Sequence, residues 1–143
     1  MKKKIAIIGS GIAGLTAANL LKSNSKFDVT VYEKEKILSL DEGYGIQLAP
    51  NSISILNKIG FSNVDNNDIY NPSKLIFYSS DNKKICDLNI SNFNSDKVKY
   101  STLKRSVLVE FLKSNLFANN IRFGKEVKKI SKIKEKLLIN FKD

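Results

Sequence analysis

The sequence predicts an α/β protein built on a parallel β-sheet, and three observations predict it. An apolar run at residues 5–8 leads into a glycine-rich turn at residues 9–14. A helix-like segment rich in Ala and Leu follows the turn, and a β-branched strand, Phe27–Tyr32, comes next. This succession of strand, glycine turn, helix and strand is typical of a Rossmann-like dinucleotide-binding unit.

Composition limits the classes of protein to consider. The chain has 143 residues, 42% of them hydrophobic, which suits one domain or part of a larger one. No apolar run approaches the ~18 residues of a membrane span, and residues 5–8 are too few for a secretory signal. We therefore expect a cytoplasmic protein without an integral membrane segment. A single cysteine, Cys86, and no histidine exclude an internal disulfide, a histidine-based metal site and a Ser/His/Asp triad.

The formal net charge of +10 raises the question of nucleic-acid binding. The basic residues are lysines apart from Arg105 and Arg122, and they are spread along a chain that is also rich in Asn and Ile. Nucleic-acid surfaces usually cluster their charge and use arginine and aromatic side chains. We therefore expect no nucleic-acid partner.

The glycines of the turn each have an expected role. Gly9 allows the tight turn off the first strand, Gly11 lets a pyrophosphate approach the backbone, and Gly14 lets helix and strand pack closely. The helix N-terminus would present N–H groups and partial positive charge to the phosphates. The apolar strand at 5–8 is expected at the buried centre of the sheet, with the helix at 12–21 packed on it.

An acidic residue, Glu33, ends the second strand about twenty residues after the glycines. A carboxylate in this position accepts hydrogen bonds from the ribose hydroxyls of a dinucleotide. It would repel the 2′-phosphate of NADP. A glycine-rich turn that binds nothing is the alternative interpretation of the motif.

The segment from residue 43 to residue 60 reads as a loop followed by a short helix. Gly43 and Gly45 suggest a close backbone approach or a bulge, and Pro50 suits the first turn of a helix. Ile53, Leu56 and Ile59 recur at helical spacing with Ile55 beside them, and Gly60 is a stop signal.

The second half of the chain is expected to contain a hairpin, a helix and three strands. A surface loop at 61–71 precedes a β-hairpin formed by residues 75–79 and 84–88. Ser101 or Thr102 could cap a helix whose buried stripe is Leu108, Phe111 and Leu112. Three short strands would then cover residues 121–123, Val127–Ile133 and Lys136–Phe141.

These motifs together resemble the N-terminal part of the FAD-dependent aromatic-ring monooxygenases, such as the salicylate and para-hydroxybenzoate hydroxylases. The GSGIAGL turn, Glu33 and the GYGIQLAPNS segment carry the resemblance, and Gly43, Gly45, Ile46, Leu48, Pro50 and Asn51 match the family pattern. Arg105, Leu108 and Leu112 fit the family's R-x-x-L-x-x-x-L helix. Where the family often has an arginine before the glycine pair, this chain has Leu40, Asp41 and Glu42.

The resemblance implies a Rossmann-like FAD-binding fold of the GR2 type that is incomplete. Residues 1–143 would form the N-terminal part of the FAD-binding domain, with a strand insertion from the substrate-side sheet at about 70–100. The family's later DG and GD segments and the rest of its substrate domain are not in this sequence. The residues expected to bind the cofactor are Gly9, Gly11, Ile12, Ala13, Gly14, Glu33, Lys34, Gly45 and Arg105.

The activity implied by the resemblance is hydroxylation of a small aromatic substrate with FAD, O2 and either NADH or NADPH. No catalytic acid or base can be named, and no metal is expected. The alternatives are a non-catalytic truncated remnant and another flavoprotein of the same fold, such as a quinone-biosynthesis hydroxylase, a halogenase or a prenyl reductase. An NAD-dependent dehydrogenase is a further class, although a hairpin and loops interrupt the regular βαβαβ succession.

Overall fold

The computed structural model describes residues 1–40 and 43–142, which divide into two compact units. Unit 1 comprises Met1–Asp41 and Val109–Asp143, and unit 2 comprises Glu42–Leu108. Each unit is described by itself. Asp41 and Glu42, which stand where relatives of the resembled family often have an arginine, lie outside the described residues.

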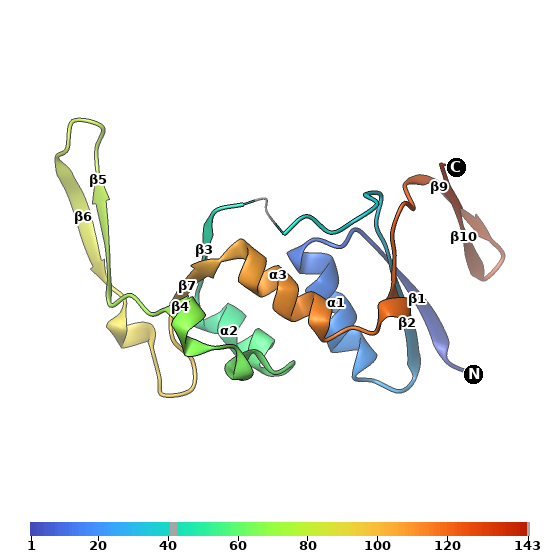
Figure 1. The fold of residues 1–143 in the computed structure, drawn as a ribbon, viewed down its shortest axis with the longest axis horizontal. Helices are drawn as coiled ribbons and strands as arrows, with labels where there is room; N and C mark the ends of the chain where they lie inside the picture. The colour runs from blue at the N-terminus through green and yellow to red at the C-terminus, as the bar shows by residue number, and fades with distance from the viewer. Residues whose placement is uncertain (41–42, 143) are drawn as a thin grey trace. The chain divides into compact units, whose positions relative to one another are not determined.

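Unit 1 is organised around a parallel sheet with strand order β1-β2-β8. Its elements are β1 (Lys3–Ile8), α1 (Ile12–Lys22), β2 (Phe27–Tyr32), β8 (Ile121–Arg122), β9 (Val127–Ile133) and β10 (Lys136–Phe141). β1 pairs with β2 in register from Lys3 opposite Phe27 to Ile8 opposite Tyr32. β9 and β10 form a separate antiparallel hairpin. Figure 1 shows α1 in blue beside β1 and β2. The predicted α/β class is therefore confirmed.

The core of unit 1 lies between α1 and β2. Leu15 and Ala18 of α1 and Val29 and Val31 of β2 are buried. Strands with β-branched residues on the inner face and a helix with small and leucine residues pack closely in this way. The interface explains why the two segments adopt the elements that their sequences predict.

The first strand differs from its prediction. β1 lies at the edge of the described sheet, and Ile8 is 49% exposed, although its apolar run predicted the buried centre. An apolar run shows that a strand can be buried, but the number of neighbouring strands decides whether it is. Among the described residues, β1 pairs with β2 alone, so one edge of β1 is not covered by a strand of the described sheet.

Two side-chain amides fix the connections of unit 1. The buried Asn19 of α1 donates from Nδ2 to the carbonyl oxygens of Leu15 (2.9 Å) and Leu112 (2.8 Å). Asn120 donates from Nδ2 to the carbonyl oxygen of Val29 on β2 at 2.8 Å. Buried side-chain amides are stable when they find hydrogen-bond partners of this kind. The amides thereby tie the segments around Leu112 and Asn120 to α1 and β2.

Unit 2 is built from short antiparallel strands, the helix α2, short 3-10 turns and the beginning of a further helix. Its elements are β3 (Gly45–Leu48), α2 (Pro50–Asn57), β4 (Ile69–Tyr70), β5 (Lys74–Tyr78), β6 (Lys84–Asn89) and β7 (Ser101–Lys104). One sheet has the order β3-β7-β4, and β5 and β6 form the predicted hairpin. α2 begins at Pro50 and buries Ile53 and Leu56, as predicted. Gly60 follows with a left-handed φ of 92°, which favours glycine.

Three predictions in unit 2 are wrong. Gly45–Leu48 is a strand rather than part of a loop, because it pairs with β7. Ser101 and Thr102 belong to β7 and do not cap a helix; α3 (Arg105–Ser114) begins after that strand. The surface loop at 61–71 contains the buried Phe61 and the short strand β4. These strands gain their partners from distant parts of the chain, and local patterns do not reveal such partners.

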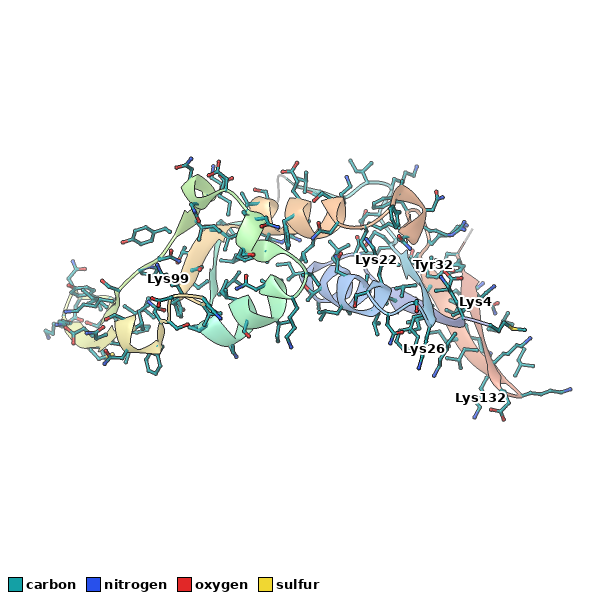
Figure 2. All side chains as sticks on the ribbon, turned by 90° about the horizontal axis from the view of Figure 1, so that it is seen from below. Lys4, Lys22, Lys26, Tyr32, Lys99 and Lys132 are labelled. Carbon is teal, nitrogen blue, oxygen red and sulfur yellow. The ribbon has the colours of Figure 1, made fainter. Side chains whose placement is uncertain are left out.

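Lysine side chains are distributed over both units (Figure 2). Lys4 lies on β1, Lys22 ends α1, Lys26 precedes β2, and Lys132 lies on β9. Lys99 of unit 2 directly precedes β7. In the part of the chain that the structure describes, no helix is long and apolar enough to cross a membrane.

Candidate functional site

The glycine turn joins β1 to α1 within unit 1. Gly9 has a left-handed φ of 95°, and its N–H donates to the carbonyl oxygen of Tyr32 at 2.8 Å. Gly11 is the N-cap of α1, and its carbonyl oxygen accepts from the N–H of Leu15 at 2.9 Å. The turn is thus anchored at one end to β2 and at the other to the first turn of the helix.

Gly14 and Gly11 have different reasons for being glycine. A Cβ added at Gly14 would lie 2.1 Å from the carbonyl oxygen of Gly9, which is far inside van der Waals contact. A Cβ added at Gly11 would meet nothing within 4 Å. Gly11 also has φ −69°, a value that L residues adopt without strain. The fold therefore requires Gly14, whereas Gly11 leaves open space beside the helix N-terminus.

Glu33 follows β2 and is held at both backbone groups. Its N–H donates to the carbonyl oxygen of Arg122 at 2.9 Å, and its own carbonyl oxygen accepts from the N–H of Lys125 at 2.7 Å. These bonds extend the pairing between β2 and β8 beyond Tyr32 and Arg122. The side chain of Glu33 consequently starts from a fixed backbone position.

The carboxylate of Glu33 reaches the glycine turn. Its Oε2 accepts from the N–H of Ser10 at 2.7 Å and from the Ser10 hydroxyl at 2.8 Å, and its Oε1 accepts from the N–H of Glu35 at 3.0 Å. Partial burial alone would raise the pKa of Glu33. The hydrogen bonds from the backbone of Glu35 and Ser10, and then from the Ser10 hydroxyl, outweigh it and lower the pKa. The group is therefore a carboxylate at neutral pH.

Ser10 is a site residue that the sequence reasoning missed. The residue is 1% exposed and lies between Gly9 and Gly11 of the turn. A signal was available, because the carboxyl ends of adjacent parallel strands meet at the same edge of a sheet. Ser10 closely follows β1 and Glu33 directly follows β2.

The other predicted residues of unit 1 lie around the same turn. Ile12 and Ala13 are the first two residues of α1, and Ala13 is exposed. Lys34 is next to Glu33 in sequence, but its side chain is 67% exposed and its Nζ lies 3.5 Å from Glu35 Oε1. Residues 9–14 and Glu33 are thus brought together, while Lys34 faces solvent.

The predicted residues of unit 2 form a second group. Gly43 has φ 119°, and a Cβ there would lie 2.6 Å from Cδ of Arg105. The N–H of Arg105 donates to the carbonyl oxygen of Tyr44 at 3.2 Å. Gly45 pairs with Lys104 where β3 meets β7. The GYGIQLAPNS segment and the arginine helix, some sixty residues apart in sequence, are therefore one local structure.

The turn between β1 and α1 and the Glu33 carboxylate beside it have the chemical groups of a nucleotide-binding site. The turn supplies open space, backbone N–H groups and a fixed carboxylate beside a helix N-terminus, which suits a nucleotide diphosphate and its ribose. Among the residues described, no group of three or more His, Cys, Asp or Glu side chains could hold a metal ion.

The fold of unit 1 and its glycine turn are Rossmann-like. The family model described as an NAD(P)-binding Rossmann-like domain matches residues 7–41, which contain the turn and Glu33.

The chain is also similar to individual monooxygenases in sequence and in structure. It is 50% identical over 62 residues to 3-amino-4-hydroxybenzoate 2-monooxygenase PtnB3 of Streptomyces platensis, a match that covers 43% of this chain and 15% of the relative. It is 27% identical to 6-hydroxynicotinate 3-monooxygenase of Bordetella bronchiseptica over 99% of this chain and 37% of the relative. The crystal structure of Klebsiella pneumoniae HpxO complexed with FAD and uric acid matches with a TM-score of 0.77 at 20% identity, covering 96% of this chain and 35% of that one.

The chain is thus similar in sequence and fold to part of the FAD-dependent aromatic monooxygenases. It spans little more than a third of the length of the Bordetella relative, even where nearly all of this chain is matched.

Proposed function

We propose that this chain is the FAD-binding N-terminal portion of a flavin-dependent monooxygenase that hydroxylates a small aromatic substrate. The observation that carries the proposal is the turn between β1 and α1, in which Gly14 is required by packing and Gly11 faces open space. A glycine that the fold itself does not need is best explained by a ligand that approaches its backbone.

The residues fit the adenosine and pyrophosphate parts of FAD. Gly9, Gly11, Ile12, Ala13 and Gly14 would hold the pyrophosphate through the turn and the start of α1. The carboxylate of Glu33 would accept a hydrogen bond from a ribose hydroxyl, for which its ionised state is suited. Unit 1 thus contains both features that this assignment needs, the negative charge of Glu33 and the open space beside Gly11.

The flavin side would be served by unit 2. Arg105 is a positively charged, planar donor at the start of α3. Gly45 lies in β3, which pairs with β7, the strand directly before α3. We assign both residues to the flavin end of the cofactor. Lys34, at the surface beside Glu33, would add positive charge near the adenosine end.

Bound FAD would supply the transfer of electrons from NADH or NADPH to O2 and of one oxygen atom to the aromatic ring. The chain's own contribution is to bind and orient the cofactor. The names of the relatives, which act on aminohydroxybenzoate and hydroxynicotinate, support a small aromatic ring as substrate. We propose the cytoplasm as the location and no nucleic-acid partner; the distribution of lysines over both units supports the latter.

The test is a fluorescence titration of the purified chain with FAD. We expect saturable binding by the wild-type chain and its loss in Gly11→Val, because the branched side chain fills the open space at the turn. Gly11→Val should still fold, since its backbone conformation suits valine and no atom other than those of its chain neighbours lies within 4 Å of the added Cβ. The poorer N-cap should cost about 1 kcal/mol, or a few degrees in Tm.

Ser23→Val is the matched control, because it adds a branched side chain at the opposite end of α1, where Ser23 is the C-cap. This variant should bind FAD as the wild type does. A wild-type chain that takes up no FAD would refute the proposal, as would equal binding by Gly11→Val. A parallel titration with NADH tests the dehydrogenase alternative, for which the match to an NAD(P)-binding domain is the specific support.

A further inference from the structure

Ser10 is a buried polar residue that hydrogen-bonds to Glu33, the proposed ribose ligand. It is 1% exposed, and both its N–H and its hydroxyl donate to the same oxygen of Glu33, Oε2. A carboxylate oxygen has about two lone-pair positions for hydrogen bonds, so these two donors fill Oε2. Oε1 accepts one bond of this kind, from the N–H of Glu35 at 3.0 Å, and the backbone N–H of Lys34 further stabilises the charged carboxylate.

We propose that Ser10 is a positioning residue that orients the Glu33 carboxylate so that the turn selects an unphosphorylated adenosine ribose. By filling Oε2, its hydroxyl fixes the rotation of the Glu33 carboxylate and leaves Oε1 as the acceptor for one ribose hydroxyl. The same bond keeps negative charge beside the ribose, where it opposes a 2′-phosphate. The inference rests on the proposed function, because it concerns the ribose of the same cofactor.

Three features of the structure favour this role over simple packing. The hydroxyl lies 2.8 Å from a carboxylate oxygen, a distance typical of a strong hydrogen bond to a charged acceptor. The hydroxyl bond is also among the interactions that lower the pKa of Glu33 against its burial. In addition, the backbone of Glu33 is fixed by Arg122 and Lys125, so the remaining freedom is that of the side chain.

Removing the hydroxyl should therefore act through Glu33. In Ser10→Ala, one lone-pair position of Oε2 becomes vacant, the carboxylate gains rotational freedom and its pKa rises. The charged residues next to Glu33 or on the segments bonded to it, which are Lys34, Glu35, Arg122 and Lys125, are unchanged in this variant. The comparison thus isolates the contribution of the hydroxyl.

The binding experiment uses isothermal titration calorimetry of the chain with ADP and with its 2′-phosphorylated counterpart. We expect the wild type to prefer ADP by at least about tenfold, and Ser10→Ala to reduce that preference to about threefold or less. Ser10→Thr, which keeps a hydroxyl, should retain most of the preference. Ser23→Ala is the matched control, since it removes an exposed hydroxyl that donates to the Leu20 carbonyl oxygen, and it should leave the ratio unchanged.

A second measurement needs no nucleotide. The pKa of the Glu33 side chain, followed by carbon NMR of the free chain, should lie below its ordinary value in the wild type and rise in Ser10→Ala. Ser10→Cys replaces the hydroxyl with a weak donor in a similar volume, so it provides the test if Ser10→Ala does not fold. It should also reduce the preference for ADP and raise the pKa.

The outcomes separate the two proposals. A wild-type preference for ADP that persists in folded Ser10→Ala or Ser10→Cys would overturn the role of Ser10 and leave FAD binding standing. An unchanged pKa of Glu33 in those variants would overturn it equally. A wild-type chain that binds neither ADP nor FAD would refute the proposed function, and the ribose role of Ser10 with it.

Discussion

Replacing Gly14 by alanine tests the close approach of α1 to the turn. The added Cβ would lie 2.1 Å from the carbonyl oxygen and 3.2 Å from the carbonyl carbon of Gly9. Both are backbone atoms, so the helix or the turn must move. Overpacking of this kind costs about 3 kcal/mol at the upper end of its usual range. Alanine returns about 1 kcal/mol through its better helix propensity. The expected net loss is therefore about 2 kcal/mol.

Thermal and urea unfolding followed by circular dichroism would measure this loss. For a chain of this size, it corresponds to a fall in Tm of about 5–8 °C. Ala17→Gly in the middle of the same helix is the reverse substitution. It should lose up to about 1 kcal/mol, as helix propensity requires. If Gly14→Ala were as stable as the wild type or more so, propensity would dominate at both positions and the packing argument would be refuted.

Three further predictions follow from other contacts. Asn19→Ala should destabilise the chain by about 1–3 kcal/mol in urea unfolding, because the Leu112 carbonyl oxygen loses its buried donor; a loss near zero would contradict this. Gly43→Ala should cost about 1–3 kcal/mol through its φ of 119° and should displace Arg105, and unchanged unfolding would argue against that conformation. Glu33→Gln should destabilise the chain more at pH 7 than at pH 3. The lowered pKa makes the ionised group's stabilisation fully present above the unfolded value of about 4.3, and it is lost as the pH falls through the folded value. A difference independent of pH would count against it.

The features that could be predicted from sequence are those determined within a short stretch of chain. The turn, α1 and β2 follow from glycine spacing, from apolar content and from β-branched residues, each within about ten positions. The β5–β6 hairpin was likewise predicted because its two strands are joined by a short turn. In each case the partner of the segment is its neighbour in sequence.

The features that were missed depend on partners distant in sequence. β3 and β7 are four residues each and pair across more than fifty positions, from Gly45 opposite Lys104 to Leu48 opposite Ser101. Ser101 and Thr102 are as suitable for a helix cap as for a strand, so residue type alone could not decide. Ser10 lies at the sheet edge where Glu33 was expected, but a serine between two glycines does not by itself show that its hydroxyl donates to that carboxylate.

The pairing of β3 with β7 also changes the weight of the motifs in unit 2. The glycine segment and the arginine helix match the resembled family separately, and on sequence they count as two independent observations. In the structure, Gly43 packs against Arg105, and the N–H of Arg105 donates to the carbonyl oxygen of Tyr44. The glycine is therefore explained in part by the space that the arginine side chain needs. The two motifs constrain each other, so a flavin contact has to be tested at Arg105 itself rather than inferred from the presence of both.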